Sequence, residues 1–181
     1  TVLRTVNGNL SLTGESLGGA TSGNRGVILQ ANSANSLTIE ATGVGTVSIV
    51  GKGSSYDIYS QNTIDILAAS GNISLEGQGA GSTYITNTVT IGRKSSTNVT
   101  SSSSDIEIID NELSWGVSGA LNLNTSGTVS IKPYGDDFSS ALSTSKITFS
   151  SDVSELTIGK TTGADGTSDA NVTIGSATTI A

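Results

Sequence analysis

The 181-residue sequence predicts an all-β protein, a right-handed parallel β-solenoid of about seven coils with roughly 26 residues each. Three observations predict this fold. Apolar residues alternate with polar ones in short stretches, these stretches recur at a nearly constant spacing, and Ser, Thr, Asn and Gly make up just over half of the chain. Right-handedness is the strong default for parallel crossovers. A β-sandwich is the alternative, but it usually has more aromatic residues than the 4% found here and no fixed spacing.

The alternation is what argues against a disordered chain, which such a polar composition would otherwise suggest. Two apolar residues separated by one polar residue place one face of a strand against a core. No stretch shows a sustained helical period. The expected strands centre on Leu10/Leu12, Leu37/Ile39, Val47/Ile49, Ile64/Ile66, Ile73/Leu75, Val89/Ile91, Ile106/Ile108, Leu121/Leu123, Val129/Ile131, Ile147/Phe149, Leu156/Ile158 and Val172/Ile174.

The spacing of these strands predicts stacked coils with about three strands each. Apolar residues in equivalent positions are expected to form inward ladders, while Gly and Asn turn the corners. The expected ladders, with steps of 25 to 27 residues, are Leu10–Leu37–Ile64, Leu12–Ile39–Ile66, Val47–Ile73, Ile58–Ile85, Leu121–Ile147–Val172 and Val129–Leu156.

The composition also excludes several classes of function. The chain has no Cys and no His, which rules out disulfides, Cys/His metal sites and Ser-His-Asp or Cys-His catalysis. A net charge of −7 with eight scattered Lys and Arg residues excludes nucleic acid and anionic membranes as expected partners. No apolar stretch approaches the ~18 residues that a membrane span requires. We expect no cofactor.

Two stretches depart from the regular strand spacing, and we expect them to bulge from the solenoid as loops. They are residues 93–118 and 134–145. Insertions of this kind often carry binding residues, so Trp115, Asp136 and Asp137 form a candidate ligand-contact site. The alternative is that both stretches are tolerated loops and that Trp115 packs against a coil.

Acidic residues offer two candidate chemistries. The pairs Asp105/Glu107, Asp110/Glu112 and Asp136/Asp137 could act as in glycosidases, but no basic cluster or aromatic platform accompanies them. We therefore expect solvated surface charge. Asp165, Gly166 and Asp169 lie in an oxygen-rich turn that lacks the spaced ligands of a calcium-binding loop, and we expect an ordinary turn without a metal.

Asn-x-Ser/Thr patterns give candidate glycosylation sites, although a chain this rich in these residues contains several by chance. They are Asn9, Asn72, Asn98, Asn124 and Asn171. The Thr-x-Thr runs at 86–88 and 88–90 do not repeat at the coil spacing, which argues against an ice-binding face.

Four segments resemble the repeat arms of large secreted bacterial adhesins of the filamentous-haemagglutinin type, which are exported by two-partner secretion. They are NGNLSLTG (7–14), SGNISLEGQGAGSTYITNTVTIG (70–92), SGTVSIKPYG (126–135) and LTIGKTTGADGTSDANVTIGSATTIA (156–181). The resemblance implies an interior section of a long, rod-like protein that is secreted or displayed on the bacterial cell surface. Since the chain starts at Thr1 and contains no Met, we expect residues 1–181 to be one solenoid segment of a longer chain.

Two hypotheses of function follow. The first is a non-enzymatic stalk or fibre module of an adhesin or surface filament, whose partners would be a host or neighbouring cell surface and its glycans. The uncapped terminal coils of such a segment could also pair with those of another copy, which would join copies into fibres. The alternative is a carbohydrate-binding or carbohydrate-degrading β-helix, in which the two irregular stretches would converge on one acidic, aromatic-lined groove.

Overall fold

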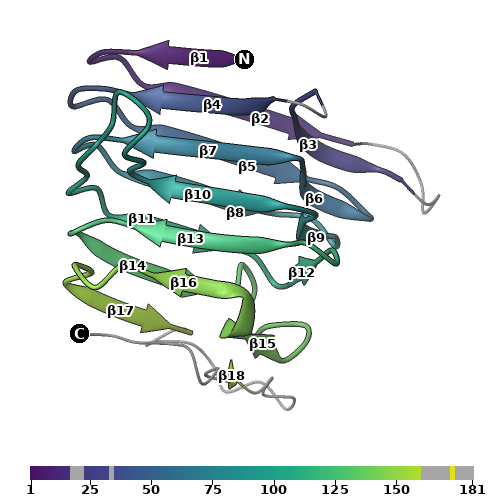
Figure 1. Ribbon diagram of the computed structural model, residues 1–181. Coiled ribbons are helices and arrows are strands. Elements are labelled where there is room, and N and C mark those ends of the chain that lie inside the picture. The colour runs from purple at the N-terminus through teal and green to yellow at the C-terminus, as the bar shows by residue number, and fades with distance from the viewer. Residues whose placement is uncertain (17–22, 33–34, 160–171, 174–181) are drawn as a thin grey trace.

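The computed structural model describes residues 1–16, 23–32, 35–159 and 172–173, and it confirms a parallel β-solenoid. Figure 1 shows the strands stacked as successive levels, with β1 at one end and β17 near the other. Each level contains three strands in chain order. Levels one to three consist of β1 (Val2–Thr5), β2 (Leu10–Glu15), β3 (Arg25–Gln30); β4 (Ser36–Ala41), β5 (Val47–Lys52), β6 (Tyr56–Gln61); and β7 (Thr63–Ala68), β8 (Ile73–Gly77), β9 (Ser82–Ile85).

Levels four to six continue the same order with shorter strands. A 3₁₀ turn, η1 (Thr144–Lys146), lies between levels five and six. The strands are β10 (Thr88–Gly92), β11 (Ile106–Ile109), β12 (Leu113–Trp115); β13 (Ala120–Asn124), β14 (Thr128–Lys132), β15 (Leu142–Ser143); and β16 (Ile147–Phe149), β17 (Glu155–Ile158), β18 (Val172–Thr173).

Parallel pairing between equivalent strands creates the walls of the solenoid. Sheet A contains β1-β4-β7-β10-β13-β16, sheet B contains β2-β5-β8-β11-β14-β17, and sheet C contains β3-β6-β9-β12. β15 and β18 pair separately in the third position of levels five and six. Every strand therefore contacts its counterpart one coil away in the sequence, the arrangement expected of a repeat protein.

The core consists of apolar ladders that run along the stack between the sheets. Ile39 pairs with Ile66, which pairs in turn with Ile91, and all three side chains are buried. A matching ladder in sheet B joins Val47, Ile73, Ile106 and Val129. Because successive residues of a strand point to opposite faces, the polar residues between them line the outer faces.

The described residues form six levels, and the first level is longer than the roughly 26 residues expected of one coil. Leu10 pairs with Val47 and not with Leu37, so the predicted Leu10–Leu37–Ile64 ladder is wrong at its first step. Leu12 likewise pairs with Ile49. The later steps, Leu37 to Ile64 and Ile39 to Ile66, are confirmed.

Sheet C and the last level also differ from the expected register. Ile58 pairs with Thr83, and Ser60 pairs with Ile85, so the predicted Ile58–Ile85 pair is wrong by two residues. A bulge between Tyr56 and Ile58 accounts for one of these, because it shifts the register by one residue. Val172 pairs with Leu142 and not with Ile147. The predicted pairs Val47–Ile73, Leu121–Ile147 and Val129–Leu156 are confirmed.

The stretch 93–118 contains both a loop and two regular strands. Ile106 and Ile108 pair with Ile73 and Leu75, so β11 occupies the ordinary sheet B position of level four. The extra residues precede it, in the segment 93–105. In Figure 1 this segment, drawn in teal between β10 and β11, climbs beside sheet A to the height of β4.

Candidate functional site: a polar pocket on sheet A

The outer face of sheet A has a ladder of polar side chains whose first members are buried. Register aligns Thr38, Asp65 and Thr90 on successive strands β4, β7 and β10. All three face away from the core, yet each is less than 9% exposed. Residues 93–105 account for this burial, because they form a flap over this face; we call residues 93–105 the flap.

The flap leaves sheet A at Gly92, whose positive φ of 106° and close backbone neighbour suit glycine alone. A Cβ there would lie 2.1 Å from the Asn124 carbonyl oxygen. The flap turns back where Lys94 N donates to Val99 O at 2.9 Å and Thr97 N donates to Lys94 O at 3.1 Å. This compact turn places Lys94, Thr97 and Asn98 over the sheet.

Two apolar residues outside the main core are buried beneath the flap or within it. Leu67 follows the inward-facing Ile66 on β7 and so points outward, but its exposed fraction is 0%. Val99 in the flap is buried as well, and neither residue belongs to the core cluster. A backbone bond also anchors the flap, because Ser103 N donates to Ala69 O at 3.0 Å.

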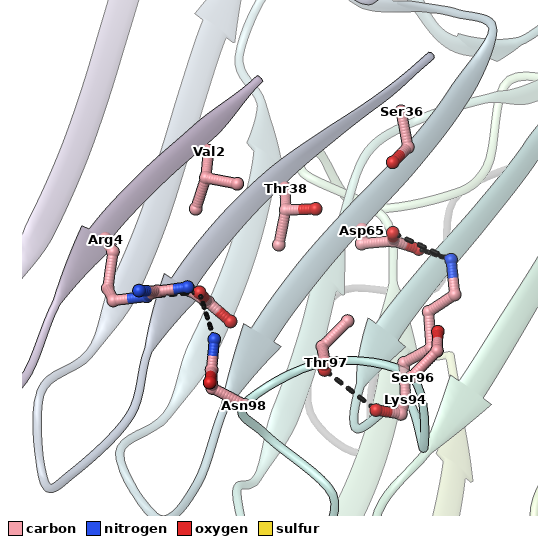
Figure 2. Close-up of a pocket in the computed structure, with 10 residues that line it drawn as sticks. Val2, Arg4, Ser36, Thr38, Asp65, Lys94, Ser96, Thr97 and Asn98 are labelled. Carbon is pink, nitrogen blue, oxygen red and sulfur yellow. Dashed lines mark hydrogen bonds and ion pairs between the residues drawn. The ribbon is translucent and has the colours of Figure 1, made fainter. Parts of the chain in front are cut away.

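Between the flap and β1, β4 and β7 lies a pocket of ≈ 220 Å³, which we call the sheet A pocket. Figure 2 shows its lining side chains, which come from strand residues on one side and from the flap on the other. They are Val2, Arg4, Ser36, Thr38, Glu40, Asp65, Lys94, Ser96, Thr97 and Asn98.

Two ion pairs fix the charged groups of the pocket. Lys94 Nζ donates to Asp65 Oδ1 at 2.9 Å and to Oδ2 at 2.8 Å, while Arg4 Nε donates to Glu40 Oε1. The Glu40 and Asp65 side chains are 1% and 2% exposed, whereas their cationic partners reach solvent. Buried carboxylates of this kind depend on their partners, because an isolated buried charge is costly.

One oxygen of Glu40 is left without a partner in the described structure. Oε1 accepts from Arg4 and from Asn98 Nδ2, the latter at 3.3 Å, but Oε2 is buried and accepts no hydrogen bond. A carboxylate oxygen in this state is a strong unused acceptor. Glu40 therefore has a buried, unused acceptor at the wall of the sheet A pocket, which donors from Arg4, Lys94 and Asn98 also line.

A second hollow of ≈ 360 Å³ lies on the other side of the flap. It is lined by Thr90, Arg93, Lys94, Ser95, Thr100 and Asn124, and Arg93 forms an ion pair with Asp152. Here the Arg93 guanidinium lowers the pKa of Asp152 through a hydrogen bond and its charge. Lys94 lies between the two hollows.

Sheet C has a cluster of tyrosines on its outer face that sequence reasoning missed. Tyr56 and Tyr59 both stack on Tyr84, with ring centroids 4.9 and 5.7 Å apart, and the Arg25 guanidinium lies 3.9 Å from the Tyr59 centroid. Tyr59 and Tyr84 are 25 residues apart, close to the length of one coil, and this spacing could have predicted that the two rings lie side by side on neighbouring strands. Rings that stack on one another turn their faces away from solvent, so this tyrosine ladder stabilises the wall and is no flat platform for a sugar.

The corner between sheets B and C contains two buried carboxyl groups, Asp57 and Asp110. Gly77 makes room for them, because a Cβ there would lie 2.0 Å from Asp110 Oδ2 and 3.0 Å from Asp57 Cβ. Thr83 Oγ1 donates to Asp110 Oδ2 at 2.6 Å, and Gly53 N donates to Asp57 Oδ1 at 2.7 Å. Burial raises the pKa of Asp110 to about 7 and also raises the pKa of Asp57.

The expectation of solvated surface charge is therefore wrong for Asp110. Its predicted partner Glu112 is half-buried. The Glu112 carboxylate accepts from Ser114 Oγ, while the Glu112 amide donates to Asp110 Oδ1 at 3.1 Å. Asp105 is exposed, and its pKa is lowered because the Thr128 N–H and hydroxyl both donate to it. Glu107 forms an ion pair with Lys132 on sheet B.

The predicted ligand-contact residues do not lie together. Trp115 follows Ser114 on β12 and packs against the core. Asp136 and Asp137 lie in the turn after β14, where Gly135 N donates to Asn111 Oδ1 at 2.7 Å. The flap covers sheet A, whereas this turn packs at the corner between sheets B and C.

The remaining predicted sites lie at turns and strand ends. Asn9, Asn72 and Asn98 are exposed, while Asn124 is half-buried and donates to Arg93 O. Thr86 donates to Ser60 O, and Thr88 begins β10. Asn171 and the turn with Asp165, Gly166 and Asp169 lie outside the described residues.

Within the described ranges, no group of three or more acidic residues is placed to hold a metal ion. No helix in that part of the chain is long and apolar enough to cross a membrane. No family model matches this chain, and neither a curated protein nor a solved structure matches it significantly.

Proposed function

We propose that this chain is a structural stalk or fibre segment of an extracellular bacterial adhesin or surface filament. The observation that carries the proposal is the unbroken register of sheets A and B through six levels. Each level is held by its neighbours alone, so such a stack lengthens by adding levels without any change of design. The repeat-like segments that resemble filamentous-haemagglutinin arms support the same role.

The first level supports an extension of the stack. Leu3 occupies an inward ladder position next to Ile39, yet it is 41% exposed. Leu10 and Leu12 also occupy ladder positions and are only partly buried. A further coil stacked on β1 and β2, from a longer chain or from a second copy, would cover this apolar surface.

Tandem fusions of one, two and four copies test the stalk role. Six levels separated by ~4.8 Å give each copy a length of roughly 24–29 Å along the stack. Electron microscopy of the fusions should show particles of constant width whose length grows in proportion to copy number. Separate globules joined by flexible links would contradict the proposal.

A further inference from the structure

We propose that the sheet A pocket binds a small, neutral, polyhydroxylated ligand, namely one or two sugar units. The pocket combines the unpartnered Glu40 Oε2 with hydroxyl and amide groups from β4 and the flap. This binding does not depend on the stalk role, because the pocket lies on the outer face of sheet A and not in the core ladders.

Glu40 determines what kind of group the pocket accepts. Its Oε2 is buried and needs a donor, and a sugar hydroxyl supplies one in a hydrogen bond to a charged group. Oε1 of the same carboxylate is already held by Arg4 and Asn98, which fixes its orientation. The carboxylate orientation is therefore fixed in the free protein, and a ligand reaches Oε2 by displacing side chains that cover it.

The charge balance of the pocket favours a neutral ligand. Arg4 and Lys94 supply two positive charges, and Glu40 and Asp65 supply two negative charges. A cationic amine at Glu40 Oε2 would meet the Arg4 guanidinium beside it and be repelled. An anion would have to compete with Asp65, which holds Lys94 through both of its oxygens.

The size and lining of the pocket agree with a sugar. At ≈ 220 Å³ it is smaller than the ≈ 300–1,000 Å³ typical of sites for drug-sized ligands, so the ligand is small. Hydroxyl groups of Ser36, Thr38 and Ser96 can both donate and accept, as the hydroxyls of a sugar require. Val2, which is 56% exposed, offers an apolar wall for the C–H face of a sugar ring.

Titration of the full chain with D-glucose, D-galactose and N-acetylglucosamine, followed by amide NMR shifts, tests the proposal. We expect saturable shifts at Thr38, Glu40, Asp65 and Asn98 with at least one sugar. Glu40→Gln replaces an acceptor by a donor in the carboxyl group, and it should weaken binding about tenfold or more.

Two further variants make the result decisive. Glu107→Gln makes the same substitution at an ion pair on sheet B and should leave sugar binding unchanged. Asn98→Ala alters an exposed flap residue, so it tests the pocket even if Glu40→Gln fails to fold, and it should weaken binding about threefold or more. Absence of saturable shifts with all three sugars, or equal binding by wild type, Glu40→Gln and Asn98→Ala, would overturn the proposal. So would tighter binding of ethanolamine at the same amides, which would indicate an amine ligand instead.

Discussion

Asp57 and Asp110 place two carboxyl groups inside the solenoid wall, in a corner that glycines keep open. The groups that face Asp110 are the Thr83 hydroxyl and amide, the Glu112 amide and the Asp57 carboxyl. Asp57 Oδ1 in turn accepts from the Gly53 amide at 2.7 Å, and the backbones of Gly79 and Gly81 also favour its charged form. These donors do not offset the cost of burying two like charges, so the pKa of each carboxyl is raised.

The corner predicts that the protein is more stable in mild acid than at neutral pH. The pKa of Asp110 is about 7 in the folded chain against an ordinary value of 3.8, so folding favours the protonated form. This contribution is complete below pH 3.8 and is lost as the pH rises through about 7. Urea unfolding should show a fall of about 2–4 kcal/mol between pH 4 and pH 8.

Substitution of the carboxyl groups separates this effect from other titrations. Asp110→Asn should flatten the pH dependence over that range. Asp105→Asn should not flatten it, because the pKa of Asp105 is lowered and its stabilising contribution is lost only as the pH falls toward and below 3.8. A wild-type stability that rises from pH 4 to pH 8 would contradict the assignment.

At the scale of single elements, the flap is the part of the fold that creates the sheet A pocket. It interrupts the coil spacing between β10 and β11 but leaves the ladders on both sides in register. Its attachment depends on the packing of Val99 and on the ion pair of Lys94 with Asp65. An insertion of this kind is tolerated because it lies outside the stacked strands.

Val99→Ala tests the anchor of the flap. Removing two buried methyl groups should lower the free energy of unfolding by about 1–3 kcal/mol. Hydrogen exchange should be faster at the Lys94 amide, which bonds to Val99 O within the flap, and at the Ser103 amide, which bonds to Ala69 O beyond it. Val117→Ala is the matched control, because Val117 is 99% exposed, and its effect should stay within about 0.5 kcal/mol. Equal effects of the two substitutions would show that the flap is not packed as described.

The elements also show what sequence can and cannot predict in a solenoid. Alternation located the strands around Ile64, Ile73 and Val129, because each buries one face in the core. Register between strands was less predictable, since Leu10 fits equally well against Leu37 and Val47 until the length of the first coil is known. The sheet A pocket could not be predicted, because the flap brings Asn98 to Glu40 across 58 residues of sequence.

At the scale of the whole molecule, the stack has an end that is open to pairing. β1 pairs with β4 on one side, and its residues from Val2 to Arg4 are exposed. Exposed edges of this kind pair readily with other strands. The chain is therefore expected to associate end to end as its concentration rises.

A charge on the first ladder tests this association. Leu3→Lys places a cation in the open end and should abolish concentration-dependent association in sedimentation velocity, while folding is kept because Leu3 is already partly exposed. Val44→Lys adds the same charge at an exposed turn and should leave association unchanged. Association that persists in Leu3→Lys would place the contact elsewhere.

Distances between spin labels test whether the parallel strands stack in sequential order. The chain has no Cys, so engineered cysteines alone would carry the labels. Ser11 lies on one outward ladder of sheet B with Ser74, Glu107, Ser130 and Thr157. Pairing Ser11→Cys with cysteines at these four positions should give backbone separations of about 10, 14, 19 and 24 Å, in that order. Distances that do not increase along this series, such as a label at Thr157 closer to Ser11 than one at Ser74, would contradict the stack.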